Sequence, residues 1–146
     1  MFYGEFFHSV DRKGRIILPS KFREAAKGNF IERFFVTRGL DKCLFMFPEE
    51  EWKAQEAKFK AISFTKQESR VFNRLFFSGA AEIIPDRQGR ILLPPYLKEF
   101  AELKKDIVVV GVSSRIEIWG QDTWKQFYGT WRPSFEEIAE KLIENQ

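Results

Sequence analysis

The 146-residue sequence is poor in the residues that build redox and metal sites. It contains one cysteine, Cys43, and one histidine, His8. A single cysteine cannot form an intrachain disulfide, which is typical of a protein in a reducing cytosol. A single histidine without clustered cysteines or carboxylates does not make a metal site, so we predict no metal and no cofactor. We interpret Cys43, which lies in an apolar run, as a core residue and His8 as a strand residue.

Long hydrophobic stretches and processing signals are also missing. No apolar run approaches the roughly 20 residues of a membrane-spanning helix. The segment Met1–Glu5 has neither the basic region nor the apolar core of a signal peptide. The sequence has no glycine-rich phosphate loop. These absences predict a cytoplasmic globular protein that binds no membrane and no small-molecule substrate.

The sequence is, however, rich in charged and aromatic residues, at 31% and 16%. The formal net charge of +3 is too small to predict nucleic-acid binding by itself. The distribution of charge is more informative. Five basic residues and no acidic residue lie between Arg12 and Arg23, and three basic residues and no acidic residue lie between Arg87 and Lys98. Two segments of the chain are therefore locally basic.

These basic segments belong to an internal repeat. The stretch Asp11–Pro19 recurs 75 residues later as Asp86–Pro94 and differs only at its third and seventh positions. In each copy an aspartate and a glycine three residues later lie between two strand-like runs, which is the pattern of a chain reversal. The aspartate can accept hydrogen bonds from turn amides, and the glycine can adopt a positive φ. We predict two turns, structured by Asp11, Gly14, Asp86 and Gly89.

The repeat extends into the flanking elements. Phe2 and Gly4 recur as Phe77 and Gly79, and each half has the order strand, turn, strand, short helix, strand, strand, helix. Each half alone, at roughly 45 residues, is close to the lower size limit for independent folding. We therefore expect the halves to pair about a pseudo-two-fold axis and to share one β core. The predicted fold is α+β and mainly β, a duplicated β-α-β module with a helical connector and a C-terminal helix.

We expect four regions along the chain. Residues 5–47 form the first module, 48–75 the helical connector, 76–121 the second module and 122–146 the C-terminal helical segment. In the connector, Trp52, Phe59 and Ile62 share one apolar stripe. Helix starts are predicted from capping patterns at Ser20, for a short helix over residues 20–26, and at Thr65 and Ser134, each followed three residues later by a glutamate.

The paired motifs resemble the AbrB-like (SpoVT–AbrB) swapped-hairpin DNA-binding domain. Two such domains in a chain of this length resemble the MraZ family of bacterial transcriptional regulators, as do the segments Met1–Glu5 and Ile116–Trp119. The resemblance covers nearly the whole chain, as far as about Arg132. It implies a swapped-hairpin barrel and a ring-shaped, nucleoid-associated homo-oligomer. It also implies binding to short tandem repeats in the promoter of division and cell-wall genes, with double-stranded DNA contacted by Arg15 and Arg90.

The residues themselves are compatible with such contacts. An arginine fork can meet guanine O6 and N7 in a bidentate way. The alternative for Arg15 and Arg90 is an ion pair with Asp11 or Asp86 that only tightens the turn, and both roles hold if the aspartate orients the arginine. The remaining basic residues are interpreted as phosphate contacts, or alternatively as a solvated face. They are Arg12, Lys13, Lys21, Arg23 and Arg87.

Three classes of function are compatible with this pattern. The first is a sequence-specific DNA-binding regulator, and the second an antitoxin-like or assembly module on the same fold. The third is a hydrolase with a pseudo-symmetric pair of aspartates, as in aspartic proteases. An arginine follows each aspartate here, where those enzymes have a small hydroxyl residue and then glycine. Basic neighbours also keep an aspartate ionised, which prevents a shared proton. We therefore favour the regulator and predict no catalytic residue.

Overall fold

The computed structural model describes residues 1–24 and 31–145 and shows an α+β fold. The strands are β1 (Phe2–Ser9), β2 (Arg15–Ile17), β3 (Phe34–Arg38), β4 (Leu44–Pro48), β5 (Ala81–Ile83), β6 (Arg90–Leu92), β7 (Asp106–Ser113) and β8 (Arg115–Gly120). The helices are α1 (Ser20–Arg23), α2 (Glu49–Lys60), α3 (Gln67–Ser78), α4 (Pro95–Phe100), α5 (Gln121–Trp131) and α6 (Phe135–Glu144), with a 3-10 turn, η1 (Arg132–Ser134), before α6. The predicted α+β class is confirmed.

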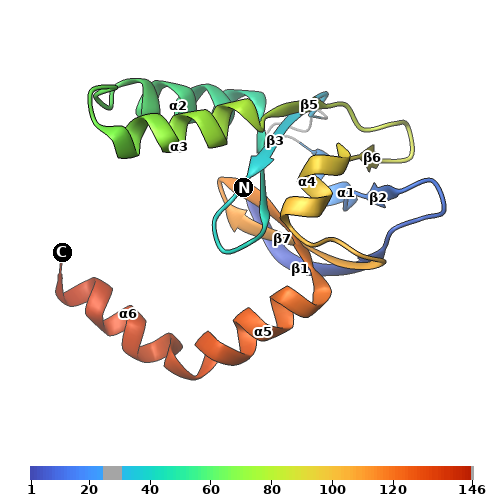
Figure 1. Cartoon of the computed structure of the whole chain (residues 1–146). Helices are drawn as coiled ribbons and strands as arrows, with labels where there is room; N and C mark the ends of the chain where they lie inside the picture. The colour runs from blue at the N-terminus through green and yellow to red at the C-terminus, as the bar shows by residue number, and fades with distance from the viewer. Residues whose placement is uncertain (25–30, 146) are drawn as a thin grey trace.

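The larger sheet has six antiparallel strands in the order β1-β7-β8-β4-β3-β5. Exchanging β1 with β5, β3 with β7 and β4 with β8 reverses this order, so the topology has two-fold pseudo-symmetry. The first strand of each half pairs with the hairpin of the other half, because β1 lies beside β7 and β5 beside β3. The two halves therefore share one sheet, as the repeat predicts (Figure 1).

The second strands of the two halves form a separate ribbon, β2–β6. Ile16 lies opposite Ile91, and these two residues occupy the same position of the repeat. Each strand is three residues long and is followed by a Leu-Pro pair, and proline has no N–H to extend a ladder. Among the described strands, β1 and β5 stay at opposite ends of the six-stranded sheet. The swapped pairing is thus confirmed, but the barrel implied by the resemblance is not closed.

The main core lies where the ribbon faces the six-stranded sheet. Ile16 and Ile91 are buried there, together with Phe22 of α1 and Leu97 of α4. The Phe22 ring makes an edge-to-face contact with the Phe2 ring of β1, at 5.5 Å between centroids. Burying an aliphatic or aromatic side chain of this size contributes about 1.5–3 kcal/mol. Apolar residues from both halves thereby fix the ribbon, and with it the two turns, against the sheet.

A second aromatic cluster holds the α2–α3 hairpin to the body. Three glutamates occupy the first turn of α2, where negative charge is favourable. The Trp52 ring stacks against Phe35 of β3 and Phe76 of α3, each at 5.6 Å between centroids. Phe59 joins this cluster, whereas Ile62 lies beyond the end of α2 and is 44% exposed, so the predicted stripe is confirmed only for Trp52 and Phe59.

The predicted helix caps at Ser20 and Thr65 are wrong, and the one at Ser134 is right in position only. The first residue of α1 is Ser20 itself, with Pro19 in the capping position and no capping side chain. Helix α3 begins two residues after Thr65, and Thr65 instead donates its backbone N–H to Ser63 Oγ. Ser134 precedes α6 but makes no capping hydrogen bond, because the 3-10 turn η1 already continues the chain from α5. Residues 25 and 26 of the first predicted helix lie outside the described residues.

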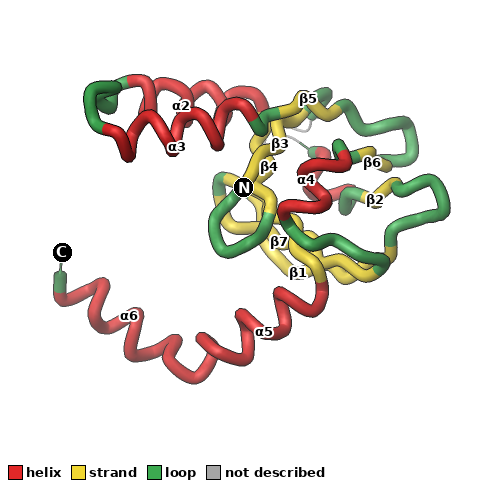
Figure 2. Tube along the Cα trace, viewed as in Figure 1, coloured by secondary structure: helices red, strands yellow, loops and turns green. Residues whose placement is uncertain are grey.

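The C-terminal helices form an arm. Helix α5 is anchored through Trp124, which contacts Trp119 of β8 at 5.2 Å between ring centroids. Helix α6 then packs chiefly against η1, and Figure 2 shows it leading away from the sheet. In the part of the chain that the structure describes, no helix has the length and apolar character needed to cross a membrane.

Candidate nucleic-acid interface

The first turn is organised by the Asp11 carboxylate. Its Oδ1 accepts the backbone N–H groups of Lys13 and Arg15, at 2.9 and 2.8 Å. Its Oδ2 accepts Nε–H of the Arg15 side chain at 2.8 Å. Gly14 has a φ of 79° and donates its N–H to the Asp11 carbonyl oxygen. One carboxylate therefore fixes both the backbone reversal and the direction of the arginine.

The second turn repeats this geometry. Asp86 Oδ1 accepts the N–H groups of Gln88 and Arg90, each at 2.9 Å, and Oδ2 accepts Arg90 Nε–H at 2.7 Å. Gly89 also has a φ of 79°. The four turn-structuring residues thus lie where the sequence predicts them. Figure 2 shows the loops that contain the two turns projecting on the same side of the molecule, away from the helical arm.

The electrostatics of the turns keep both aspartates ionised. The backbone N–H of Arg15, followed by its side chain, holds the pKa of the Asp11 carboxyl below its usual value of 3.8 and outweighs partial desolvation. The Arg90 backbone and side chain lower the pKa of Asp86 in the same way. Each turn therefore carries a fixed carboxylate that orients a fixed guanidinium.

The outer face of the β2–β6 ribbon lies between the two turns. In the ladder, Arg15 is opposite Leu92 and Ile17 is opposite Arg90. Residues directly opposite each other, and residues two apart on one strand, share a face of a sheet. Ile16 and Ile91 point into the core, so these other four side chains share the outer face. We call this set, Arg15, Ile17, Arg90 and Leu92, the ribbon face.

Both arginines of the ribbon face remain accessible. The side chain of Arg15 is 26% exposed and that of Arg90 is 29% exposed, although each is paired with its aspartate. Each arginine therefore forms the predicted ion pair with its aspartate, and it stays partly exposed. The ion pair engages Nε of each guanidinium, and about a quarter of each side chain remains exposed. Ile17 and Leu92 are 49% and 59% exposed, so the ribbon face also presents apolar surface to a ligand.

Each turn is also flanked by a basic residue from the other half of the chain. A Cβ atom built on Gly14 would lie 3.4 Å from Nζ of Lys98, which belongs to α4. A Cβ atom built on Gly89 would lie 2.6 Å from Nε of Arg23, which belongs to α1. Arg23 was among the predicted contacts, but Lys98 was not. The sequence did contain a signal for Lys98, because it follows Arg23 by 75 residues and so occupies the same position of the repeat.

The structure brings most of the predicted basic residues to the turns. Arg12, Lys13 and Arg87 are exposed at the turns themselves, and Lys21 is exposed on α1. The first turn thus gathers basic side chains from positions 12, 13, 15 and 98, and the second from positions 23, 87 and 90. The second turn has one basic residue fewer, because Gln88 replaces the lysine of the first turn.

The structure offers little for redox or metal chemistry. Cys43 is fully buried and donates its thiol to the Leu40 carbonyl oxygen, and burial raises the pKa of the thiol far above its usual range. His8 lies in β1, as predicted. Within residues 1–24 and 31–145, no three histidine, cysteine or acidic residues are grouped so that they could hold a metal ion.

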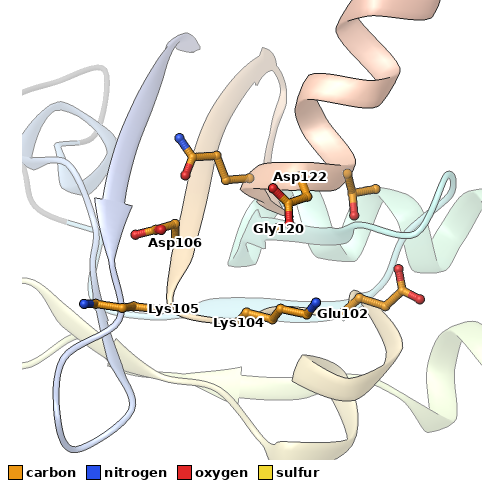
Figure 3. A pocket seen from close by; sticks show the side chains of 8 residues that line it. Glu102, Lys104, Lys105, Asp106, Gly120 and Asp122 are labelled. Carbon is orange, nitrogen blue, oxygen red and sulfur yellow. The ribbon is translucent and has the colours of Figure 1, made fainter.

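A shallow pocket lies where β7 and α5 begin, and its lining mixes both signs of charge. It includes Glu102, Lys104, Lys105, Asp106 and Asp122. Figure 3 shows the Lys104 side chain turned toward Glu102 and the Lys105 side chain pointing the opposite way. The backbone carbonyl of Lys105 accepts Val10 N–H at 2.7 Å, just before the first turn. The pocket presents no activated nucleophile, but it places Lys105 near the base of that turn.

Comparison with known proteins agrees with this duplicated architecture. A family model described as "MraZ protein, putative antitoxin-like" matches the chain twice, over residues 1–75 and 76–146. The chain belongs to the MraZ family. The two matches meet at the offset of the repeat, so each MraZ unit contributes one turn, one ribbon strand and one hairpin of the shared sheet.

Full-length relatives support the same assignment. The chain is 51% identical over 144 residues to "Transcriptional regulator MraZ" of Carboxydothermus hydrogenoformans, covering 99% of this chain and 98% of the relative. It is 49% identical to the protein of the same name from Heliobacterium modesticaldum, covering 99% and 98%. The Pelotomaculum thermopropionicum protein of that name is 51% identical, covering 99% and 97%. These MraZ relatives match the chain along its whole length.

Proposed function

We propose that this protein is a sequence-specific DNA-binding transcriptional regulator that acts as a ring-like homo-oligomer on tandem promoter repeats. The observation that supports it best is the ribbon face. A two-stranded β-ribbon fits the major groove of B-DNA, and arginine is the side chain that most often contacts guanine there. Two aspartate-oriented arginines stand on one such ribbon, between two exposed basic turns.

The division of labour between the basic residues follows from their positions. Arg15 and Arg90 contact bases, because their carboxylate partners fix the direction of each guanidinium. Arg12, Lys13, Lys21, Arg23 and Arg87 contact phosphates, and we add Lys98 to this set because its Nζ lies beside Gly14 of the first turn. Phosphate contacts set the register of a protein on DNA, and base contacts select the sequence.

A ring-like assembly supplies the affinity that one small ribbon lacks. The ribbon strands are three residues long, so a single copy touches few base pairs. Linking several copies converts later contacts into intramolecular ones and raises the overall affinity. Regularly spaced copies match direct repeats in DNA, and the relatives' name points to transcription as the process controlled. We place the target upstream of the division and cell-wall genes and the protein on the nucleoid in the cytoplasm.

The geometry of the aspartates argues against a hydrolase. The two turns stand at opposite ends of the antiparallel ribbon, because Arg15 pairs with the last residue of β6. Each carboxylate is also occupied by its own arginine and turn amides. A shared proton requires two carboxylates in contact and a raised pKa for one of them, whereas both pKa values are lowered here.

The decisive test is binding of Arg15→Ala and Arg90→Ala variants to DNA from upstream of the protein's own gene. Loss of a bidentate base contact costs about 1–3 kcal/mol, so each variant should bind roughly 5- to 150-fold more weakly in a gel shift. The matched control is Lys125→Ala, an exposed basic residue on α5. Unchanged binding by Arg15→Ala, with an intact melting curve, contradicts the role given to the ribbon face.

The assembly alternative gives a different result. If the fold serves protein contact rather than DNA, light scattering with and without the upstream DNA will show a monomer or simple dimer that ignores the DNA. The proposed regulator should instead form a larger particle that gains mass when the DNA is added. Footprinting on the same DNA should then show protection at regularly spaced sites.

A further inference from the structure

The C-terminal arm exposes an apolar surface that the rest of the described chain leaves open. A groove between α5 and α6 is lined by Trp131, Phe135, Ile138 and Leu142, among others. Phe135 and Leu142 are 68% and 65% exposed. A helix of this length is not stable in isolation, and soluble proteins seldom leave such patches uncovered. The arm therefore needs an occupant.

The charges beside this surface indicate the chemistry of the partner that could cover it. Glu136, Glu140 and Glu144 recur every four residues along α6, so they form a row on one flank of the apolar stripe. All three are exposed. We call the stripe of Phe135, Ile138 and Leu142, together with this acidic row, the α6 face. Its partner should present an apolar stripe beside a row of basic residues.

Helix α3 of the same protein has this pattern. Val71 and Leu75 are 45% and 54% exposed, although their neighbours Phe72 and Phe76 pack into the connector. Lys66, which directly precedes α3, recurs at four-residue spacing with Arg70 and Arg74 on one flank of the stripe. Arg70 also donates to two backbone carbonyl oxygens, those of Phe64 and Thr65. We call the stripe of Val71 and Leu75, together with this basic flank, the α3 face. It carries the charge and the apolar stripe that complement the α6 face.

We propose that the α6 face of one copy docks on the α3 face of a second copy. This contact rests on the proposed function, because it supplies the association that the homo-oligomer requires. A symmetric contact between two α6 faces would oppose two acidic rows and is disfavoured by like-charge repulsion. The α6–α3 contact is heterologous, so each copy keeps one face for the next neighbour, and repetition closes a ring or extends a chain.

The position of the two faces agrees with DNA binding by the assembly. In Figure 1 the α2–α3 hairpin and the α5–α6 arm both extend to the left of the sheet, and the two turn loops project to the right. Docking through the arms therefore covers neither turn. The helices that join copies and the ribbon that contacts DNA occupy different sides of the molecule.

Charge reversal tests the contact in solution. Glu136→Lys combined with Glu140→Lys should reduce the particle mass in light scattering to that of a single chain. Lys66→Glu combined with Arg74→Glu should do the same. Mixing the two variants should restore the assembly, because the reversed α6 face then meets the reversed α3 face. None of these residues belongs to the core, so circular dichroism and thermal unfolding should match the wild type.

The matched control is Glu32→Lys combined with Glu56→Lys, which changes the charge equally at two exposed glutamates outside both faces. It should leave the mass unchanged. A single-chain wild type, an unaltered mass for both arm variants, failure to reassemble on mixing, or loss of mass in the control would each overturn the docking proposal. A single-chain wild type would also remove the homo-oligomer from the proposed function, whereas upstream DNA binding that depends on Arg15 would still support its DNA-binding part.

Discussion

The Asp11 and Asp86 carboxylates make the turns sensitive to acid. Both have a folded-state pKa below 3.8, so their contribution to stability is complete above the unfolded-state value and is lost as the pH falls through the folded-state value. We expect the wild type to lose stability below about pH 4 more steeply than the Asp11→Asn, Asp86→Asn double variant. Urea unfolding at a series of pH values measures this difference.

The asparagine variant separates turn formation from arginine orientation. Asn keeps one carbonyl oxygen for the turn amides but loses the charge that holds the arginine. At neutral pH the variant should therefore fold, yet bind upstream DNA about tenfold more weakly. DNA affinity equal to that of the wild type would show that the aspartates only shape the backbone.

Ile17 and Leu92 stand beside the two arginines on the ribbon face, and we expect them to contact thymine methyl groups. Apolar side chains make this contact in the major groove. Replacing thymine by uracil in the binding site removes those methyl groups. Each lost methyl contact costs about 0.8 kcal/mol, so wild-type binding should weaken about fourfold for each contact. The Ile17→Ala, Leu92→Ala variant should show little further loss. An equal loss for variant and wild type would exclude this contact.

The two turn glycines have the same φ of 79° but different surroundings. A Cβ at Gly14 would meet the flexible end of Lys98 at 3.4 Å, whereas a Cβ at Gly89 would meet the Arg23 guanidinium at 2.6 Å. Both alanine variants incur the cost of a left-handed conformation, about 1 kcal/mol. Gly89→Ala must also displace Arg23, so it should lower the free energy of unfolding by more than Gly14→Ala. Urea unfolding of the two variants provides the comparison, and equal losses would contradict it.

The turns were predictable because their determinants are local. Asp, Gly and Arg at fixed spacing specify the reversal, and the structure places Asp11 and Asp86 as expected. The cap predictions at Ser20 and Thr65 failed because Pro19 and Lys66 occupy the N-cap positions of α1 and α3. The repeat gave a wrong expectation at one position. Phe77 aligns with Phe2 of β1 but lies in α3, not in a strand. The connector helix extends into this segment, and β5 is therefore shorter than β1.

The small size of each half predicted a shared sheet, but it did not predict the order of the strands in that sheet. Nothing local indicates that β1 pairs with β7 rather than with β2, because strand pairing depends on which apolar faces meet in the folded core. The same limit hid Lys98, whose role depends on α4 of one half lying against the turn of the other. Residues contributed within a turn were thus predictable, but nothing local indicated that Arg23 and Lys98 each lie against the turn of the other half.

The assembled molecule should bind DNA with a steep dependence on salt. Each phosphate neutralised releases counterions, so the slope of log K against log salt falls by about 0.9 for every contact. Lys13→Ala removes one phosphate contact in every engaged copy. The change in slope between wild type and Lys13→Ala therefore counts the copies that hold the DNA, at about 0.9 for each.

The same titration with the Glu136→Lys, Glu140→Lys variant links this count to the arm. If docking of α6 on α3 sets how many turns reach the DNA together, this variant should show a slope close to that of one copy. In this variant, the change in slope caused by Lys13→Ala should then fall to about 0.9, the value for one phosphate contact. Arg15→Ala should instead weaken binding to the promoter far more than binding to random DNA, because base contacts select sequence. A slope that stays steep when the particle mass has fallen would mean that the turns act without assembly.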